Sequence, residues 1–384
     1  MVRVLILTRS TGEGHNRVAQ ALRSAFESRG HDCEVVDALC AVGKAHKPDV
    51  TAPGTARHLG ADVASQWYGW AALRMPHLFG AVYTAGDLYA RTRVPSPIYL
   101  THARLAEATN AYILEHGFDV VLATHLFPQE TLSAIRRRHP SRVRYYGVLT
   151  DYSCTPFFAE PRLDGYFIPD ADMLESCRKY GLPPRWTYAT GLPVAQRFRQ
   201  PMGATQARTV LGLPPGTPLF LVMSGGVGGM YTGRVCDKLL ADGGEATHVV
   251  VLTGRREDLF TAIAGKYRDD RRVNVVPFTD RVADYMAAAD VMVSKPGAVS
   301  STEAAVAGLP LVHTAAIPGG ETKNARFFAD RGMSVYSQNP VEAARLAHWL
   351  LRGPDRLARM RDCQRQMIAD GADRVVARIE DLTL

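Results

Sequence analysis

The sequence predicts an α/β protein built from two doubly wound parallel sheets. Short apolar strands alternate with amphipathic helices along most of the 384 residues, which is the order of βαβ units. The chain is also longer than the ~250 to 300 residues that one hydrophobic core usually serves. Proline and glycine interrupt the pattern between Pro193 and Pro218. We therefore expect two domains, residues 1–198 and 199–384.

The first half contains apolar runs separated by helical patterns. Val18, Leu22 and Phe26 recur at helical spacing after the first strand and predict an amphipathic helix. A second helix is expected over residues 129–138. Strands are expected at residues 2–7, 33–36, 119–123, 143–149 and 166–168.

A second series of strands begins at residue 219. Its members are expected at residues 219–223, 247–252, 273–276, 291–293 and 311–313. The chain ends in a helical stretch over residues 356–382, which could return to the first domain. Two doubly wound halves account for this order most simply.

Composition limits the classes of function. Hydrophobic residues make up 46% and charged residues 22%, values typical of a soluble globular protein. The net charge of +7 fits an anionic ligand or an anionic membrane surface as well as nucleic acid, and no motif in the chain points to nucleic acid. The six cysteines show no paired or metal-binding spacing, which predicts a reducing cytosolic location and no metal site.

Membrane contact is expected to be peripheral, at the inner face of the cell membrane. No signal peptide precedes the first strand, and no apolar run approaches the ~18 residues of a membrane span. The region between Asp37 and residue 104 is rich in aromatic, apolar and basic residues, among them Trp67, Tyr68 and Trp70. These residues form either part of the core or an interfacial element that receives an apolar acceptor, because Trp and Tyr favour the boundary of water and lipid.

The segment from Ser294 to Pro310 has the pattern of an anion-binding turn that opens a helix. Pro296 and Gly297 allow a sharp turn after an apolar strand. The next polar residues, Ser300, Ser301 and Thr302, are all competent helix caps. The free N–H groups and the positive end of the helix dipole then suit a pyrophosphate.

Glu303 lies about one turn inside the same predicted helix. A carboxylate there can accept hydrogen bonds from the two neighbouring hydroxyls of a ribose, whereas phosphates would repel it. The pattern therefore indicates a nucleoside diphosphate. A well-capped surface helix with a dipole-favoured Glu303 is the alternative.

The loop after the first strand, Thr11-Gly-Glu-Gly-His-Asn-Arg17, resembles a dinucleotide fingerprint with Asp37 as its ribose-binding acid. Arg17 replaces the third glycine, which the fingerprint needs for close helix packing, and this argues against hydride transfer. His15 stands at the start of a helix, where the dipole disfavours the imidazolium. A neutral imidazole can accept a proton from a hydroxyl, which makes His15 a candidate general base. A structural capping histidine is the alternative.

Several loops of the second half also follow strands. One of them, Met223-Ser-Gly-Gly-Val-Gly-Gly-Met230, has four glycines that permit close approach to a phosphate or a sugar. Ligands bind beyond the carboxyl ends of strands in open α/β sheets, so we expect these loops to converge. The other loops lie at residues 253–255, 277–279 and 318–324.

These segments together resemble glycosyltransferase family 28, specifically its diacylglycerol glycosyltransferase and monogalactosyldiacylglycerol synthase branch. The resemblance covers nearly the whole chain and depends on the order of the motifs and their places after strands. The motifs are Gly12-Glu-Gly14-His15, Thr124-His125, Leu149-Thr-Asp151-Tyr152, Thr190-Gly-Leu-Pro193, Ser224-Gly-Gly, Thr253-Gly-Arg255, Lys295-Pro-Gly297 to Gly308-Leu-Pro310, and Pro318-Gly-Gly-Glu321 with Asn324.

The resemblance implies a GT-B fold, in which two Rossmann-like domains face a central cleft. It implies inverting transfer of a hexose from a UDP-sugar to a hydroxyl, without a metal ion or another cofactor. The C-terminal domain would bind the donor and the N-terminal domain the acceptor. The implied donor-binding residues are Gly14, Ser224, Gly225, Gly226, Arg255, Phe278, Gly297, Ala298, Val299, Ser300, Glu303, Glu321 and Asn324.

By the same resemblance, Glu303 would hold the ribose, Arg255 and Phe278 would line the uracil and diphosphate region, and Glu321 with Asn324 would contact the sugar. His15 is then the candidate base, with Asp151 as a second candidate base or its partner. The residues implied at the acceptor are His125 and Tyr152.

Two departures from the family pattern leave alternatives open. Gly320 stands where family members often carry Gln, so the sequence does not select glucose, galactose or an N-acetyl sugar. The residues after Asp151 lack the His and Trp of characterised lipid glycosyltransferases. A lipid hydroxyl such as that of diacylglycerol and a soluble small-molecule acceptor are therefore both considered. A UDP-sugar 2-epimerase and a nucleotide-sugar sensor without catalysis are the rival classes.

Overall fold

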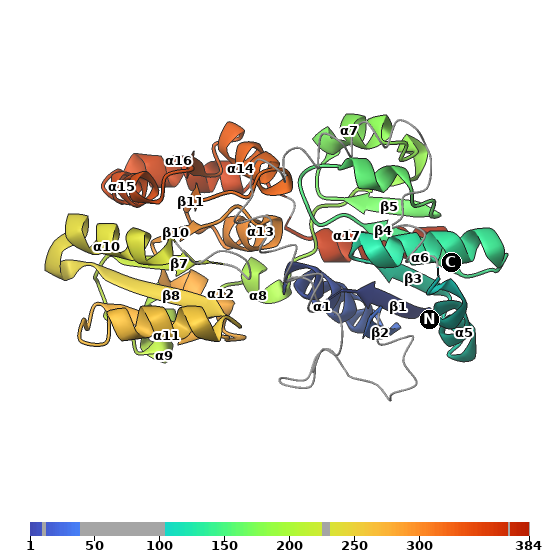
Figure 1. Cartoon of the computed structure of the whole chain (residues 1–384), viewed down its shortest axis with the longest axis horizontal. Helices are drawn as coiled ribbons and strands as arrows, with labels where there is room; N and C mark the ends of the chain where they lie inside the picture. Colours follow the sequence, from blue (N-terminus) through green and yellow to red (C-terminus); the bar gives the residue numbers. More distant parts are fainter. Residues whose placement is uncertain (10–12, 39–103, 225–230, 368, 384) are drawn as a thin grey trace. The chain divides into compact units, whose positions relative to one another are not determined.

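A computed structural model describes residues 1–9, 13–38, 104–224, 231–367 and 369–383 of the chain. The chain divides into two compact units (Figure 1). Unit 1 is Met1–Ala195 together with Ile368–Leu384, and unit 2 is Gln196–Met367. The aromatic insertion expected between Asp37 and residue 104 lies almost wholly outside the described residues.

Unit 1 has a parallel sheet of six described strands in the order β2-β1-β3-β4-β5-β6. All residues of β3 and β5 are buried, as expected for a parallel sheet covered on both faces. The strand bounds are β1 (Arg3–Thr8), β2 (Asp32–Asp37), β3 (Val120–Ala123), β4 (Arg144–Val148), β5 (Gly165–Ile168) and β6 (Thr187–Ala189).

Helices cover this sheet. In the first helix the residues Val18, Leu22 and Phe26 are fully buried, which confirms the predicted apolar face. The described helices of unit 1 are α1 (Glu13–Ser28), α5 (Ala106–Glu115), α6 (Leu126–Arg138), α7 (Leu174–Lys179) and α17 (Gly371–Thr383), with the short 3-10 helices η2 (Pro156–Ala159), η3 (Ala171–Met173) and η4 (Pro184–Trp186).

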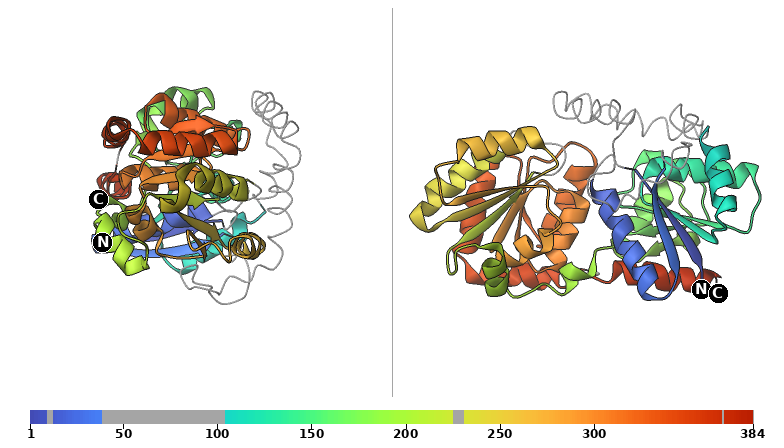
Figure 2. Two further views of the ribbon diagram at one scale, coloured as in Figure 1. Left: turned by 90° about the vertical axis from the view of Figure 1, so that its left-hand side faces the viewer. Right: turned by 90° about the horizontal axis from the view of Figure 1, so that it is seen from below.

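The last helix, α17, belongs to unit 1 although the chain reaches it from unit 2. Its residues Val375, Val376 and Ile379 are fully buried. Glu380 accepts hydrogen bonds from Arg29 Nη1 at 2.7 Å and His31 Nε2 at 2.9 Å, beyond the end of α1. The two chain ends therefore lie side by side in unit 1 (Figure 2). The helical stretch expected over residues 356–382 is two helices, because the chain turns before Gly371.

Gly371 provides a stability prediction. A Cβ atom at Gly371 would lie 2.8 Å from Leu192 O and 2.9 Å from Gly191 O, and backbone atoms of this kind cannot move aside cheaply. We expect Gly371→Ala to lower the free energy of unfolding by about 1 to 3 kcal/mol, the usual cost of overpacking. Urea denaturation followed by circular dichroism measures this. The matched control is Gly203→Ala, because Gly203 has φ −61° and a Cβ atom there would meet no other atom within 4 Å; equal midpoints for the two variants would contradict the prediction.

Unit 2 repeats the architecture with a parallel sheet in the order β12-β11-β10-β7-β8-β9. Its central strands are apolar and buried, and they form the core together with the helices that cover them. The strand bounds are β7 (Leu219–Met223), β8 (His248–Gly254), β9 (Val273–Pro277), β10 (Val291–Ser294), β11 (Leu311–Thr314) and β12 (Val335–Ser337).

Nine α-helices belong to unit 2 in the described part of the chain. They are α8 (Gln196–Arg199), α9 (Ala204–Leu211), α10 (Thr232–Gly243), α11 (Glu257–Lys266), α12 (Val282–Ala288), α13 (Ala298–Val306), α14 (Gly320–Asp330), α15 (Pro340–Leu351) and α16 (Pro354–Gln364), with the 3-10 helix η5 (Gly244–Ala246).

Every predicted strand is present within two residues of its expected ends. The strands β6 and β12 were not predicted, because three-residue edge strands are too short to show an apolar period. The predicted helix over residues 129–138 begins three residues earlier, at Leu126.

Each sheet has one point at which the strand order reverses. In unit 1 the chain goes from β1 to β2 and then returns to the other side of β1 as β3. In unit 2 the reversal lies between β7 and β10. Ligands of open α/β sheets bind beyond the carboxyl ends of the strands at such points.

Candidate functional site

In unit 1, His15 lies at the reversal of the strand order. It is the third residue of α1, which follows β1. Its ring Nδ1 lies 2.8 Å from the carbonyl oxygen of Thr124, which follows β3, and 3.1 Å from the hydroxyl of Thr150, which follows β4. Three adjacent strands therefore contribute to one cluster at the carboxyl edge of the sheet.

The contact with Thr124 determines the tautomer of His15. A carbonyl oxygen only accepts hydrogen bonds, so Nδ1 must carry the hydrogen. The neutral ring then has its lone pair on Nε2. This is the nitrogen that a general base needs, held in a fixed orientation by its partner on Nδ1.

Burial lowers the pKa of His15 below its usual value of 6.5, and this effect exceeds the two that raise it. The first opposing effect is the charge of Asp151, and the second is the hydrogen bond to Thr124. The imidazole is therefore neutral at neutral pH. Asp151 acts on His15 electrostatically, so the structure brings the two candidate bases close to one another.

His125 packs against His15, with ring centroids 4.6 Å apart in an edge-to-face arrangement. It is the N-cap of α6, and its Nδ1 accepts a hydrogen bond from the N–H of Phe127 at 3.1 Å. Tyr152 is buried next to Asp151 in sequence. All four unit 1 residues predicted for catalysis or for the acceptor thus follow the carboxyl ends of β1, β3 and β4.

In unit 2, the helix start at Gly297 differs from the prediction. Gly297 is the N-cap of α13, without a side-chain hydrogen bond. The predicted caps lie inside the helix and bond elsewhere: Ser300 Oγ to Gly297 O at 3.2 Å, Ser301 Oγ to His313 Nε2 at 2.9 Å, and Thr302 Oγ1 to Ala298 O at 2.7 Å.

The prediction of a polar cap is therefore wrong. No side chain caps the first turn of α13. The N–H groups of Ala298, Val299 and Ser300 have no acceptor within the helix, because an α-helix leaves its first donors unpaired. A bare, glycine-capped helix start of this kind suits an anion.

Two residues of α14 bond to the turn between β10 and α13. Glu321 forms an ion pair with Lys295 Nζ, and its Oε2 accepts from the N–H of Ile317 at 3.0 Å. Asn324 is fully buried, and its Nδ2 donates to Pro296 O at 3.3 Å. The loops that follow β10 and β11 are thereby fixed to one another. Glu303 lies inside α13 and is only 2% exposed.

Arg255 and Phe278 meet at the ends of the neighbouring strands β8 and β9. The guanidinium carbon of Arg255 lies 3.8 Å from the centre of the Phe278 ring, which is a cation–π contact. Phe278 is 41% exposed, although it is a large apolar side chain. An exposed aromatic face beside a cation at this edge can stack on a planar base.

The glycine-rich loop after β7 lies mostly outside the described residues, and Gly225 and Gly226 belong to that part. Ser224 is described and buried, with its Oγ 2.6 Å from Thr232 Oγ1 at the start of α10. Gly14 is described too, in the first turn of α1 in unit 1.

Several residues that hold these groups lie inside the quoted motifs, but no role was predicted for them. Thr124 and Thr150 position His15, and Lys295 pairs with Glu321.

Ala315, just after β11, has φ +48°, the one positive φ of a non-glycine residue in the described ranges. The residue after Ala315 is Ala316, and the side chain of Gln338 forms hydrogen bonds with both its N–H and its C=O. Strained backbone of this kind gathers at functional sites, and no local sequence signal marks it.

Within the ranges that the structure describes, no helix is long and apolar enough to cross a bilayer. The same ranges contain no group of three or more His, Cys, Asp or Glu side chains arranged to hold a metal ion.

Comparison with known proteins identifies both halves of the chain. Residues 54–194 match the family model of monogalactosyldiacylglycerol (MGDG) synthase. Residues 232–375 match the glycosyltransferase family 28 C-terminal domain. The chain contains an MGDG synthase domain and a glycosyltransferase family 28 C-terminal domain. The resemblance inferred from the motifs is confirmed, and the protein is a glycosyltransferase.

Curated relatives extend this result over most of the length. The chain is 25% identical over 361 residues to the processive diacylglycerol beta-glucosyltransferase of Bacillus subtilis (strain 168), covering 94% of this chain and 89% of that protein. It is 24% identical over 360 residues to the protein of the same name from Staphylococcus aureus (strain MRSA252), covering 93% and 87%.

Solved structures confirm the GT-B fold of this glycosyltransferase. MurG of Acinetobacter baumannii superposes with a TM-score of 0.59 at 14% identity, over 99% of this chain and all of that one. The UDP-GlcNAc 2-epimerase of Neisseria meningitidis, solved with UDP-GlcNAc, superposes with a TM-score of 0.65 at 10% identity, over 99% of this chain and all of that one. At these identities the likeness concerns the fold alone.

Proposed function

We propose that this glycosyltransferase moves a hexose from a UDP-sugar to the free hydroxyl of diacylglycerol, with inversion at the anomeric carbon. The observation that carries the proposal is His15, a neutral imidazole whose Nδ1–H is tied to Thr124 O, leaving Nε2 as a base. It lies in a chain with an MGDG synthase domain and a family 28 C-terminal domain. The named activity of the curated relatives supports diacylglycerol as the acceptor.

The donor binds to unit 2 in this proposal. The uncapped start of α13 receives the pyrophosphate, with the N–H groups of Ala298, Val299 and Ser300 as donors. Glu303 accepts hydrogen bonds from the ribose hydroxyls, and Phe278 stacks on the uracil with Arg255 beside it. Glu321 and Asn324, anchored to the Lys295–Pro296 turn, contact the sugar.

The chemical step is a single displacement. Nε2 of His15 accepts the proton of the acceptor hydroxyl while the oxygen attacks C1 of the sugar. The bond between C1 and the β-phosphate oxygen breaks, and UDP leaves with the bonding electrons. The imidazolium that forms is stabilised by Asp151, whose charge already raises the pKa of His15.

The charge that develops on UDP is neutralised by groups of this chain. The positive end of the α13 dipole faces the diphosphate, and Arg255 adds a cation at the ends of β8 and β9. We propose that these groups perform the task that a bound divalent cation performs elsewhere. Because the acceptor is a membrane lipid, the enzyme works as a peripheral protein at the bilayer surface.

A direct assay tests the proposal. Purified full-length protein is incubated with dioleoylglycerol in mixed micelles and with UDP-glucose, UDP-galactose or UDP-N-acetylglucosamine in parallel. We expect one donor to give UDP and a glycolipid, whose proton coupling at the anomeric carbon shows a β linkage. Mass spectrometry of the donor alone is the control. Epimerised donor without any acceptor, or transfer only to soluble alcohols, would refute the proposal.

A further inference from the structure

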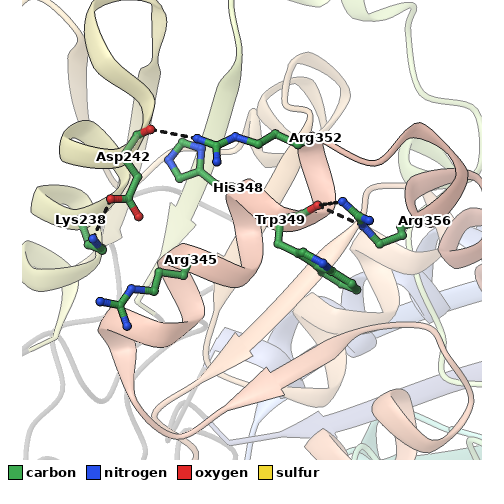
Figure 3. Close-up of a pocket in the computed structure, with 7 residues that line it drawn as sticks. All are labelled: Lys238, Asp242, Arg345, His348, Trp349, Arg352 and Arg356. Carbon is green, nitrogen blue, oxygen red and sulfur yellow. Dashed lines mark hydrogen bonds and ion pairs between the residues drawn. The ribbon is translucent and has the colours of Figure 1, made fainter.

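A basic pocket lies on unit 2, and Figure 3 shows the side chains that line it. Its volume is about 420 Å³, and α10, α15 and the start of α16 line it. Both α10 and α15 run back from the carboxyl edge of the sheet, so their last turns lie at its amino edge. His348, near the end of α15, donates from Nε2 to Leu239 O of α10 at 2.9 Å, and this contact fixes the two helices together.

The pocket carries an excess of positive charge. Four cationic side chains line it, Lys238, Arg345, Arg352 and Arg356, against the one carboxylate of Asp242. Lys238 already pairs with Asp242 at 2.6 Å. Burial lowers the pKa of His348, so this ring adds no charge of its own.

Three arginines are left to bind a ligand. Arg352 Nη2 donates to the backbone carbonyl of Asp242 at 3.1 Å, and Arg356 Nε donates to the carbonyl of Trp349 at 3.1 Å. Neither has a carboxylate partner among the described residues. In the described ranges, the carboxylate that pairs with Arg345 is the partly exposed Glu342, at 3.2 Å. Each guanidinium has five N–H donors, so donors remain after these contacts and are suited to phosphate oxygens.

An exposed tryptophan stands among these arginines. Trp349 is 46% exposed, and the guanidinium carbon of Arg356 lies 4.3 Å from its ring centre. A soluble phosphate would use the arginines and leave the indole in water. A phospholipid surface uses both, because Trp sits at the level of the headgroups while arginines bind the phosphates.

We propose that this pocket binds the phosphate of an anionic phospholipid, with Arg345, Arg352 and Arg356 as the donors and Trp349 in the headgroup layer. The site shares no residue with the proposed donor and acceptor sites and does not depend on the proposed reaction. It gives unit 2 its own contact with an anionic membrane surface.

Vesicle flotation tests the proposal with the full-length protein. Vesicles are made of phosphatidylcholine alone or of phosphatidylcholine with phosphatidylglycerol. We expect the double variant Arg345→Glu/Arg352→Glu to lower the partition coefficient on the anionic vesicles by about tenfold or more, since each cation near such a surface contributes measurably. Trp349→Ala should lower it severalfold without any change of charge.

The matched control is Arg268→Glu/Arg271→Glu, which changes the net charge equally at exposed positions elsewhere on unit 2. Circular dichroism and UDP titration check that every variant is folded. If the partition coefficient on anionic vesicles falls equally in the two double variants, or falls in neither, the proposal is overturned. If one double variant does not fold, the result for Trp349→Ala decides. The proposal is also overturned if inorganic phosphate raises the melting temperature while the protein shows no preference for anionic vesicles. It is overturned as well if the protein binds RNA in a gel-shift assay but does not bind vesicles.

Discussion

Replacing His15 by Ala is expected to lower kcat by about 10²- to 10⁴-fold, the usual contribution of a positioned general base. The KM for the UDP-sugar should change little, because the proposed donor contacts lie on unit 2. Steady-state kinetics with diacylglycerol in mixed micelles measures both constants. The matched control is His116→Ala, because His116 also bonds a backbone carbonyl, Tyr112 O at 2.9 Å, but lies before β3 and not at a carboxyl end. A full loss in Asp151→Asn with near-normal kcat in His15→Ala would identify Asp151 as the base.

The pH dependence follows from the direction of the pKa shift. The neutral imidazole is the active form, and burial lowers the pKa of His15 below 6.5. Activity should therefore persist below pH 6.5 and decline only as the pH falls through the lowered pKa. Asp151→Asn removes the charge that raises this pKa, so it should move the acidic limb of kcat/KM to still lower pH. A shift of that limb to higher pH would contradict the arrangement.

The sequence allowed the strands and their loops to be predicted, since buried parallel strands read as short apolar runs. It also allowed His15, Glu303 and Arg255 to be selected by their places after strands. The two hydrogen-bond partners of His15 could not be predicted, because Thr124 and Thr150 lie 109 and 135 residues away in the chain. Only the sheet order brings them together.

The start of α13 shows why local rules failed at one position. Ser301 has the chemistry of a cap, but it bonds to His313 of β11, and Gly297 is the N-cap of its helix. Tertiary contacts therefore overrode local propensity. The pairing of Lys295 with Glu321 could not be predicted for a similar reason, since nothing in the spacing of these residues specifies that the loops after β10 and β11 meet.

Replacing Glu303 by Gln should weaken UDP binding about 10- to 100-fold, because hydrogen bonds to a charged group contribute about 1.5 to 3 kcal/mol. Gln preserves the shape of this buried side chain, and the variant is therefore preferable to Ala. Isothermal titration with UDP measures the affinity, and circular dichroism confirms the fold. Glu245→Gln, an exposed glutamate of unit 2, is the matched control and should bind UDP normally.

Titration with 2′-deoxy-UDP separates a ribose contact from a structural role of Glu303. The unchanged protein should bind this analogue more weakly than UDP, because the carboxylate loses one hydroxyl donor. In Glu303→Gln the difference in affinity between UDP and 2′-deoxy-UDP should largely disappear. The substitution and the missing hydroxyl remove the same interaction, so their effects do not add. Equal weakening of UDP and its deoxy analogue would instead mean that Glu303 supports α13 from within, and unchanged affinity would exclude it from the nucleotide site.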